Sequence, residues 1–542
     1  MKQVRLAADL AIFDVRLPAT GRFVHRRLIR LAATCALEAS LHLIILDGTS
    51  RSPVSDLATE LSSLRLIAAR ASSSASLAEN RRIRRQRRTF LVPQDKKAER
   101  TNIMASLRIS GGSMISRRHF VQLGTIAGAA LSAGSLLQAG AEEAHVPLPP
   151  SIAALKSMKE QAKPIRLDER RERQEKARHL MEANRIDALL LMEGTSLDYF
   201  TGIQWWGGER LFAMVLPAKG AAFYVCPAFE EERAREQIAT APGSKQADIR
   251  TWQEDDNPYQ RLAQGLKDRG ISTGKLGMEE TVRFLFTNEI AKAAPQVNIV
   301  SGTPITAGCR MVKSNHEIAL MQLANKATLA AYEATYLALR EGMTQSDFSD
   351  LIAQAYTQLG FSGEASVQVG EYSANPHGSA TPQVIREGSI VMVDDGCTVE
   401  GYQSDITRTF VLGKASDKMK KVFDIVHRAQ TAALKTARPG LECQAVDAAA
   451  RKVITDAGYG PDYKYFTHRL GHGIGMDGHE WPYLVRGNAT PMAANMTFSD
   501  EPGIYIPGEF GIRLEDDMHI TENGAELFTP QSPSLENPFG TT

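Results

Sequence analysis

The stretch VMVDDGCTVEGYQSDITRTF, residues 391–410, contains two β-branched apolar runs joined by a Glu-Gly turn signal. This pattern is typical of a β-hairpin. A turn centred on Val399 and Glu400 would place Asp394 opposite Asp405, with their Cβ atoms roughly 5 Å apart. Two carboxylates at that distance repel each other, so each is expected to need a cation.

A second stretch, DEPGIYIPGEFGIRLE at residues 500–515, repeats this arrangement. Its Pro-Gly pair marks a turn, and Glu501 and Glu515 are symmetric about Gly508. Between the two hairpins lies HRLGHGIGMDGHE, residues 468–480, which is dense in histidine and glycine. Four carboxylates and one imidazole would form a cage for two hard or borderline divalent metals.

Residues 310–530 resemble the catalytic domain of the pita-bread metallopeptidases, the family of Xaa-Pro dipeptidase (prolidase), aminopeptidase P and methionine aminopeptidase. The resemblance implies an α+β catalytic domain at 306–535, in which helices cover one face of an antiparallel sheet. The family's five metal ligands match residues of this chain in order and in hairpin context: Asp394, Asp405, His472, Glu501 and Glu515.

The resemblance also implies a role for each ligand. Asp405 and Glu515 would bridge the two metals, Asp394 would chelate one, and His472 and Glu501 would complete the other. A metal-bridging hydroxide would be the nucleophile, and Glu501 would carry its proton to the leaving nitrogen as a catalytic residue. Mn²⁺ is the favoured metal, with Co²⁺ or Zn²⁺ as alternatives.

Four further residues would act on the substrate. By the same resemblance, His377 and His479 are catalytic residues that would hydrogen-bond the scissile carbonyl or the tetrahedral oxyanion. His468 would line the pocket for the proline side of the substrate. Arg513 would orient Glu515 or bind the substrate carboxylate.

Residues 167–305 are expected to form a smaller α/β domain, because apolar strands alternate with helical segments there. It resembles the N-terminal domain of prolidase, aminopeptidase P and creatinase. Trp205 and Trp206 stand beside glycines in this domain. In the resembled family this loop can approach the partner's active site in a homodimer, so either tryptophan would wall a substrate pocket; core packing is an equal alternative.

The net charge of +1 is the sum of a basic N-terminal segment and an acidic remainder. Residues 1–118 contain 22 Lys and Arg against 9 Asp and Glu, whereas the remainder contains 41 against 53. The acidic body of the chain does not favour binding to nucleic acid. Five scattered cysteines lack the spacing of a disulfide framework and are expected to be buried thiols.

Residues 114–141 resemble a twin-arginine export signal, because Arg117 and Arg118 precede an uncharged Ala/Gly-rich stretch that ends in small residues. Its moderate hydrophobicity and length argue against stable membrane insertion after cleavage. A periplasmic or secreted protein is therefore expected, with a cytoplasmic one as the alternative. Residues 1–113 are interpreted as a disordered leader or as sequence upstream of a true start at Met114, and 142–166 as a linker.

Three classes of function fit these features. The first is a dinuclear peptidase that hydrolyses the Xaa-Pro bond of dipeptides or short peptides, and the choice between dipeptidase and aminopeptidase stays open. The second is a creatinase-like hydrolase of a small non-peptide C–N substrate. The third is a non-catalytic relative. The complete ligand set argues against the second and third.

Overall fold

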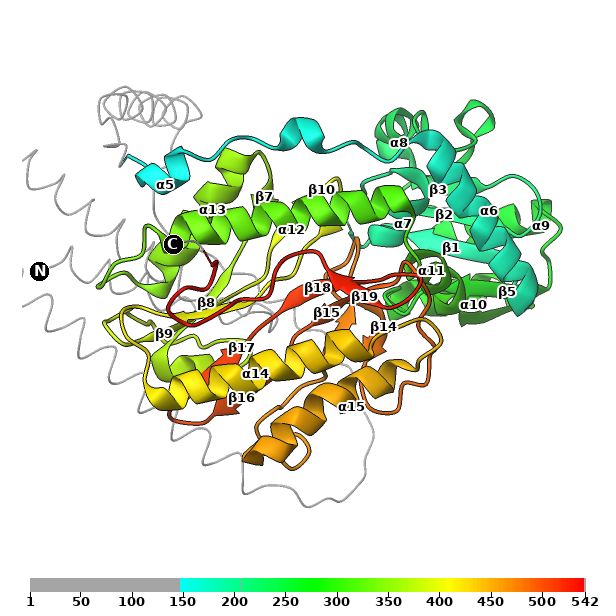
Figure 1. Ribbon diagram of the computed structural model, residues 1–542. Helices are drawn as coiled ribbons and strands as arrows, with labels where there is room; N and C mark the ends of the chain where they lie inside the picture. Colours follow the sequence, from blue (N-terminus) through cyan, green and yellow to red (C-terminus); the bar gives the residue numbers. More distant parts are fainter. Residues whose placement is uncertain (1–146, 206, 541–542) are drawn as a thin grey trace, which may run out of the picture. The chain divides into compact units, whose positions relative to one another are not determined.

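The computed structural model describes residues 147–205 and 207–540. In this part of the chain an α/β domain precedes a larger domain of sheets and long helices (Figure 1). The expected leader 1–113 and export signal 114–141 lie outside the described residues, as do Cys35 and Trp206. Within the described ranges, no helix combines the length and apolar character needed to cross a bilayer.

The first domain is built on one mixed six-stranded sheet with the order β4-β3-β2-β1-β5-β6. The central strand β1 reads ALLLM and is buried at every position, as expected for a strand covered on both faces. The pairs β1–β5, β5–β6 and β3–β4 are parallel, whereas β2 is antiparallel to both of its neighbours. The strands are β1 (Ala188–Met192), β2 (Ala213–Pro217), β3 (Phe223–Pro227), β4 (Asp248–Trp252), β5 (Gly274–Met278) and β6 (Val297–Ser301).

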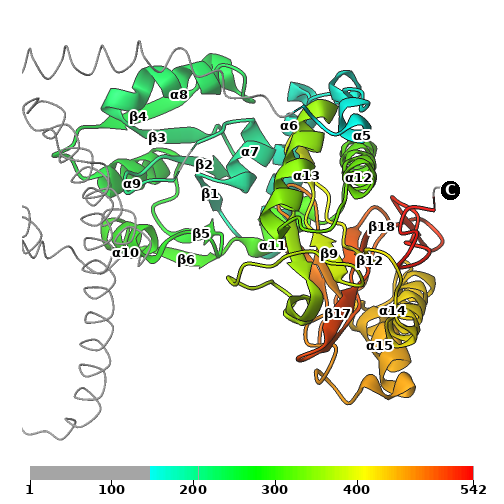
Figure 2. The same ribbon diagram turned by 90° about the vertical axis from the view of Figure 1, so that its left-hand side faces the viewer.

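Helices cover both faces of this sheet (Figure 2). One face packs against α6 (Leu167–Asn184), α7 (Thr195–Thr201), α8 (Glu231–Ile238) and α11 (Thr303–Arg310). The other face packs against α9 (Pro258–Asp268) and α10 (Phe284–Ala293). The predicted compact α/β domain is therefore confirmed.

The second domain places antiparallel sheets between two pairs of long helices (Figure 1). Helices α12 (Asn315–Tyr336) and α13 (Gln345–Leu359) share a core with the sheet β12-β9-β8. Helices α14 (Asp417–Thr436) and α15 (Cys443–Ile454) share another core with the sheet β14-β13-β15-β18-β19 and the hairpin β16–β17. This is the predicted α+β pita-bread arrangement.

The strands of the second domain are short. The first group comprises β7 (Ser362–Gly363), β8 (Ser366–Val369), β9 (Ile390–Asp394), β10 (Cys397–Val399), β11 (Tyr402–Gln403) and β12 (Arg408–Val411). The second comprises β13 (Gly471–Gly473), β14 (Glu480–Leu484), β15 (Thr497–Asp500), β16 (Gly503–Ile506), β17 (Phe510–Arg513), β18 (Asp516–Ile520) and β19 (Ala525–Leu527).

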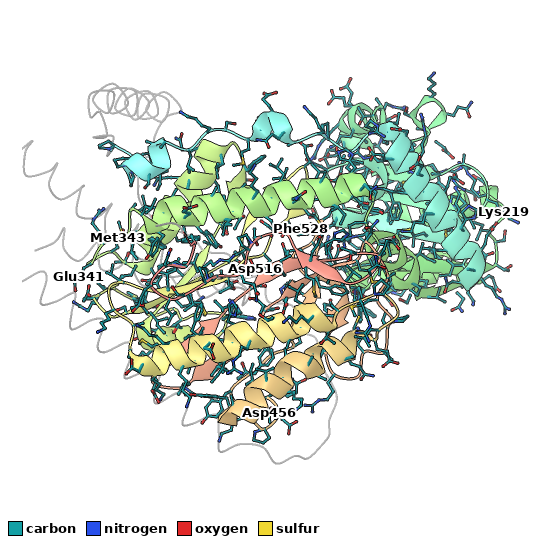
Figure 3. The ribbon with its side chains drawn as sticks, in the orientation of Figure 1. Lys219, Glu341, Met343, Asp456, Asp516 and Phe528 are labelled. Atoms are coloured by element: carbon teal, nitrogen blue, oxygen red, sulfur yellow. The ribbon has the colours of Figure 1, made fainter. Side chains whose placement is uncertain are left out.

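Local sequence explains where the long helices begin. Ser314 and Glu317 form the capping box expected from the sequence, with each side chain bonded to the other residue's backbone N–H. Farther along, Gln430 on α14 donates to Asp516 on β18 over 2.9 Å, so this helix is bonded to the sheet. Asp516 is labelled in Figure 3. The four cysteines in the described residues are free and buried, as predicted.

The register of the first hairpin differs from the prediction. β9 and β12 pair Val393 with Arg408, so the position opposite Asp394 is Thr407 rather than Asp405. The turn residues are Glu400 and Gly401, with φ of 49° and 85°, and this two-residue turn lies one position later than expected. A one-residue change in the turn centre shifts the partner by two positions.

The register of the second hairpin is confirmed. β16 and β17 pair Gly503 with Arg513 about a turn at Gly508, where φ is 76°. Continuing this register brings Glu501 opposite Glu515. Glu501 lies where the chain leaves β15 for the hairpin, and Glu515 lies where it leaves the hairpin for β18, so the two carboxylates come from neighbouring connections.

A buried polar network joins the two domains. Arg173 on α6 donates to the Tyr402 hydroxyl over 2.7 Å and lies 3.3 Å from the Glu317 carboxylate. The Tyr402 hydroxyl in turn donates to Glu317 over 2.8 Å. The Arg173 and Glu317 side chains are only 8% and 4% exposed. Because Tyr402 belongs to the hairpin that contains Asp394, the first domain contacts this hairpin directly.

Candidate metal centre

Five separate segments converge on one cluster of possible ligands. Three overlapping groups have ligand atoms within 4.8 Å of one another. Asp394, Asp405 and Glu515 form one group, and His472, Glu501 and Glu515 form another. The third group combines Asp405 and His472 with His479. All five residues that the sequence predicts as ligands are therefore found together.

His472 is held as a neutral imidazole with one nitrogen available. Its Nδ1 lies 3.1 Å from the carbonyl oxygen of Gly473, so Nδ1 carries the proton. Burial and the neighbouring His479 lower the pKa of His472 to about 3. Its Nε2 lies 3.5 Å from Glu501 and 3.7 Å from Asp405, so the lone pair of this nitrogen points into the carboxylate cluster.

Three of the four carboxylates are unfavourable as anions in the absence of a cation. Burial raises the pKa of Glu515 and of Asp405, and the charges of the neighbouring carboxylates raise both further. Burial also raises the pKa of Glu501 to about 8, although the Arg513 charge opposes this change. A divalent cation would remove the repulsion among these groups, so the donor set fits the two divalent metals expected here.

Asp394 differs from the other three carboxylates because Arg513 pairs with it. Burial favours the protonated acid, but the Arg513 charge and the Thr407 hydroxyl together lower its pKa. Thr407 contacts two carboxylates, Asp394 over 2.6 Å and Glu515 over 2.5 Å. Arg513 Nε lies 2.9 Å from the same hydroxyl, so arginine and threonine hold both side chains in place.

The predicted substrate-side residue His468 belongs to a hydrogen-bonded chain next to the cluster. Its Nδ1 lies 2.8 Å from the Arg469 carbonyl, and its Nε2 lies 2.7 Å from the Tyr505 hydroxyl. Arg513 donates to this hydroxyl over 3.1 Å. Burial and the Arg513 charge lower the pKa of His468 to about 3, so it is neutral and accepts the hydroxyl proton at Nε2.

Of the other two predicted histidines, His479 belongs to the cluster. The His479 ring stacks on His472, with ring centroids 3.7 Å apart. Burial lowers the pKa of His479, and the positive charges of Arg469 and His377 lower it further. His377 is exposed and is also among the charges that lower the pKa of His468, but no direct contact in the described residues joins its ring to the cluster.

The predicted loop of the first domain lies in a different setting. The Trp205 ring stacks on Phe212 at 3.8 Å and packs against the domain core. The Arg233 guanidinium lies 4.4 Å above the same ring. This arrangement matches the core-packing alternative for Trp205 within this chain.

Sequence reasoning missed Thr407, Tyr505 and Arg469. Thr407 could have been found from the sequence, because a turn centred on Glu400 and Gly401 places Thr407 opposite Asp394. No sequence feature pointed to Arg469 other than its position next to His468. Its guanidinium lies 4.2 Å over the Tyr483 ring, and it has no ion-pair partner among the described residues.

Paired carboxylates around a neutral histidine, inside a pita-bread sheet, define a metal-dependent hydrolase. Comparison with known families is more specific. Residues 319–522 match metallopeptidase family M24, and residues 173–312 match the creatinase/prolidase N-terminal domain. The chain belongs to metallopeptidase family M24, whose members use divalent metals.

Individual relatives agree with this assignment. An Xaa-Pro dipeptidase from Lactobacillus delbrueckii subsp. lactis is 32% identical over 67% of this chain and 98% of the relative. The crystal structure of dipeptidase PepE from Mycobacterium ulcerans has a TM-score of 0.65 and 33% identity, covering 69% of this chain and 99% of that one. An X-Pro aminopeptidase structure from Thermotoga maritima has a TM-score of 0.54 and 30% identity, covering 64% and 96%.

Proposed function

We propose that this metallopeptidase hydrolyses Xaa-Pro dipeptides with two divalent cations, of which Mn²⁺ is favoured. The observation that carries the proposal is the convergence of four carboxylates and a neutral imidazole within one cluster of possible ligands. The five ligands would be Asp394, Asp405, His472, Glu501 and Glu515. When bound, the cations supply Lewis acidity that makes water nucleophilic near neutral pH.

The chain's own residues would complete the reaction. Glu501, the more exposed member of the facing pair, would accept the proton from the attacking water and deliver it to the leaving nitrogen. His479 and His377 would donate hydrogen bonds to the oxygen that gains negative charge. His468, neutral and bonded to Tyr505, would line the side of the site that receives proline.

Arg469 supports a dipeptide rather than a longer peptide as substrate. Its charge acts on Glu501 and on His479, and its guanidinium has no carboxylate partner in the part of the chain described here. A free α-carboxylate on the proline of a dipeptide would match this cation. Arg513 is less suitable for binding the substrate carboxylate, because its guanidinium already pairs with Asp394 and donates to the Tyr505 hydroxyl.

The test compares an Xaa-Pro dipeptide with the matching Xaa-Pro-Yaa tripeptide after chelation and addition of Mn²⁺. The dipeptide should have the higher kcat/KM, and Arg469→Met should raise its KM more than that of the tripeptide. Equal kcat/KM for the two substrates would favour an aminopeptidase. Absence of metal-dependent hydrolysis of both would contradict the proposal.

Two further features belong to the proposal. A homodimer is supported by Phe229, Phe284 and Leu285, which are 64%, 80% and 49% exposed on the first domain and which a second copy would cover. Light scattering of the purified protein tests this assembly. Export to the periplasm is supported by the sequence around Arg117 and Arg118.

A further inference from the structure

His479 lies in a loop whose position depends on its flanking residues. The loop connects β13 to β14, and no hydrogen bond within residues 147–205 and 207–540 involves the His479 ring. The stacking contact with His472 is between two ring faces and does not fix the ring along the plane. The neighbours of His479 in sequence must therefore determine where its nitrogens lie.

Asp477, two residues before His479, is bonded to the first domain. Thr195, the first residue of α7, donates its hydroxyl to Asp477 over 2.5 Å. Arg310, the last residue of α11, donates Nη2 to the other carboxylate oxygen over 2.6 Å. Both donors lie within residues 173–312, the region that matches the creatinase/prolidase N-terminal domain.

Glu480, directly after His479, is held by the same arginine. Arg310 Nη2 lies 2.5 Å from one Glu480 oxygen, and Lys313 Nζ lies 2.6 Å from the other. The side chains of Arg310, Lys313 and Glu480 are 10%, 2% and 6% exposed. Ion pairs this deeply buried are poorly screened by solvent, so they restrain the loop strongly.

Trp481, which follows Glu480, provides a third bond between the His479 loop and the first domain. The Trp481 indole Nε1 donates to Glu280 of the first domain over 2.9 Å. Three of the four residues nearest His479 in the chain are thus bonded to side chains from outside the loop. Gly478 is the exception, since it has no side chain.

We infer that the first domain positions His479 for catalysis through Thr195 and Arg310, which act as positioning residues. The inference rests on the proposed function, in which His479 stabilises charge on the substrate oxygen. Neither residue contacts the ligand cluster. Each holds a carboxylate beside His479, and a displacement of about 1 Å in a catalytic group can reduce the rate by up to about a hundredfold.

Thr195→Val is the most selective test, because it removes one hydroxyl and preserves the shape of the side chain. It should lower kcat by about tenfold and leave KM and the bound metal nearly unchanged. In a His479→Ala background the same substitution should change kcat by less than about twofold, because no imidazole remains to be positioned. Arg310→Lys should lower kcat in the same way, since lysine can reach only one of the two carboxylates.

Arg250→Lys is the matched control. Arg250 pairs with Asp248 and Asp268 in the same domain, at 2.9 and 2.6 Å, and should tolerate the change without loss of kcat. A normal kcat in Thr195→Val, or an equal loss with and without His479, would overturn the positioning role. If His479→Ala alone kept full activity, the proposed catalytic role of His479 would be wrong and the inference would fall with it. The two failures are therefore distinguishable.

Discussion

Arg408 and Asp516 form an ion pair of 2.6 Å, with side chains that are 1% and 0% exposed. Arg408 also donates to the backbone carbonyl of Glu515 over 2.9 Å. Gln430 and Thr529 add hydrogen bonds to the Asp516 carboxylate, at 2.9 and 2.6 Å. This pair therefore connects the hairpin that contains Asp394 to the strand that follows Glu515.

Asp516→Asn should destabilise the protein because it leaves Arg408 buried without a counterion. The expected loss in free energy of unfolding is about 3–5 kcal/mol. Urea denaturation of the purified variant and of the unmodified protein measures it. Glu509→Gln is the control, because Glu509 pairs with Lys418 at the surface, where the side chains are 45% and 49% exposed. Its loss should be less than about 1 kcal/mol, and equal losses in both variants would contradict the role of the buried pair.

Glu515→Gln should weaken metal binding without unfolding the protein. The change removes one negative charge and one ligand oxygen while nearly preserving volume. Activity should become more dependent on added metal, because less charge remains to hold the cations. Metal analysis after dialysis, together with kinetics over a range of Mn²⁺ concentrations, measures the effect. Two tightly bound metals and full activity in this variant would show that the dinuclear assignment is wrong.

His479→Ala should lose activity but keep its bound metal, in contrast to Glu515→Gln. Its proposed role is to stabilise charge on the substrate oxygen, so both metals should remain bound while kcat falls. The expected loss is about 3 kcal/mol in transition-state stabilisation, or roughly a hundredfold in rate. The same metal analysis and kinetics distinguish this variant from Glu515→Gln. Loss of metal from His479→Ala would instead indicate that His479 is a ligand.

The metal-free protein should lose stability as the pH rises, to the extent that Glu501 contributes. The pKa of Glu501 is raised from 4.5 to about 8, mainly by burial. The folded state therefore binds more protons than the unfolded state between these values. The stabilisation is complete below pH 4.5 and is lost as the pH approaches 8. Thermal midpoints of the chelated protein across this range check the direction, and a rising midpoint would contradict it.

Metal binding should consequently release protons at neutral pH, because cations displace the proton from Glu501. Calorimetric titration with Mn²⁺ in two buffers of different ionisation enthalpy measures the number released. The number should be smaller at pH 9 than at pH 7. Identical heats in the two buffers at pH 7 would mean that the carboxylates are already ionised.

Export is tested by replacing Arg117 and Arg118 with lysines. The twin-arginine machinery recognises the arginine pair itself, so the precursor should remain in the cytoplasm. Fractionation of cells that express the complete chain measures the distribution. Recovery of the variant from the periplasm at the normal level would contradict the proposal.

The candidate ligands could be predicted because the motifs that carry the family resemblance are short and local in sequence, and hairpin symmetry added support only in the second hairpin. The turn marked by Pro507 and Gly508 lies where the sequence predicts it, and the resulting register places Glu501 opposite Glu515 as expected. The first register was predicted wrongly, because the turn was centred on Val399 and Glu400 rather than on the Glu-Gly pair itself. In the structure Glu400 and Gly401 form the turn, both with positive φ, and Val399 stays in the strand as a β-branched residue prefers.

The support around the ligands could not be predicted in the same way. Arg310 and Asp477 are 167 positions apart in sequence, and only the packing of the two domains brings them together. The same holds for Arg408 and Asp516, which are 108 positions apart. Periodicity and turn signals contain no information on such pairs, since both depend on residues that are close in the chain.

The Arg173, Tyr402 and Glu317 network makes the two domains energetically dependent on each other. Separating the two domains would leave the Arg173 cation in one and the Glu317 carboxylate in the other, each without its partner in an environment built to exclude water. The chain should therefore melt in one cooperative transition, without a populated state in which only one domain is folded. Such coupling also makes either domain a poor candidate for recombination with an unrelated neighbour, so the two are expected to be inherited as a unit.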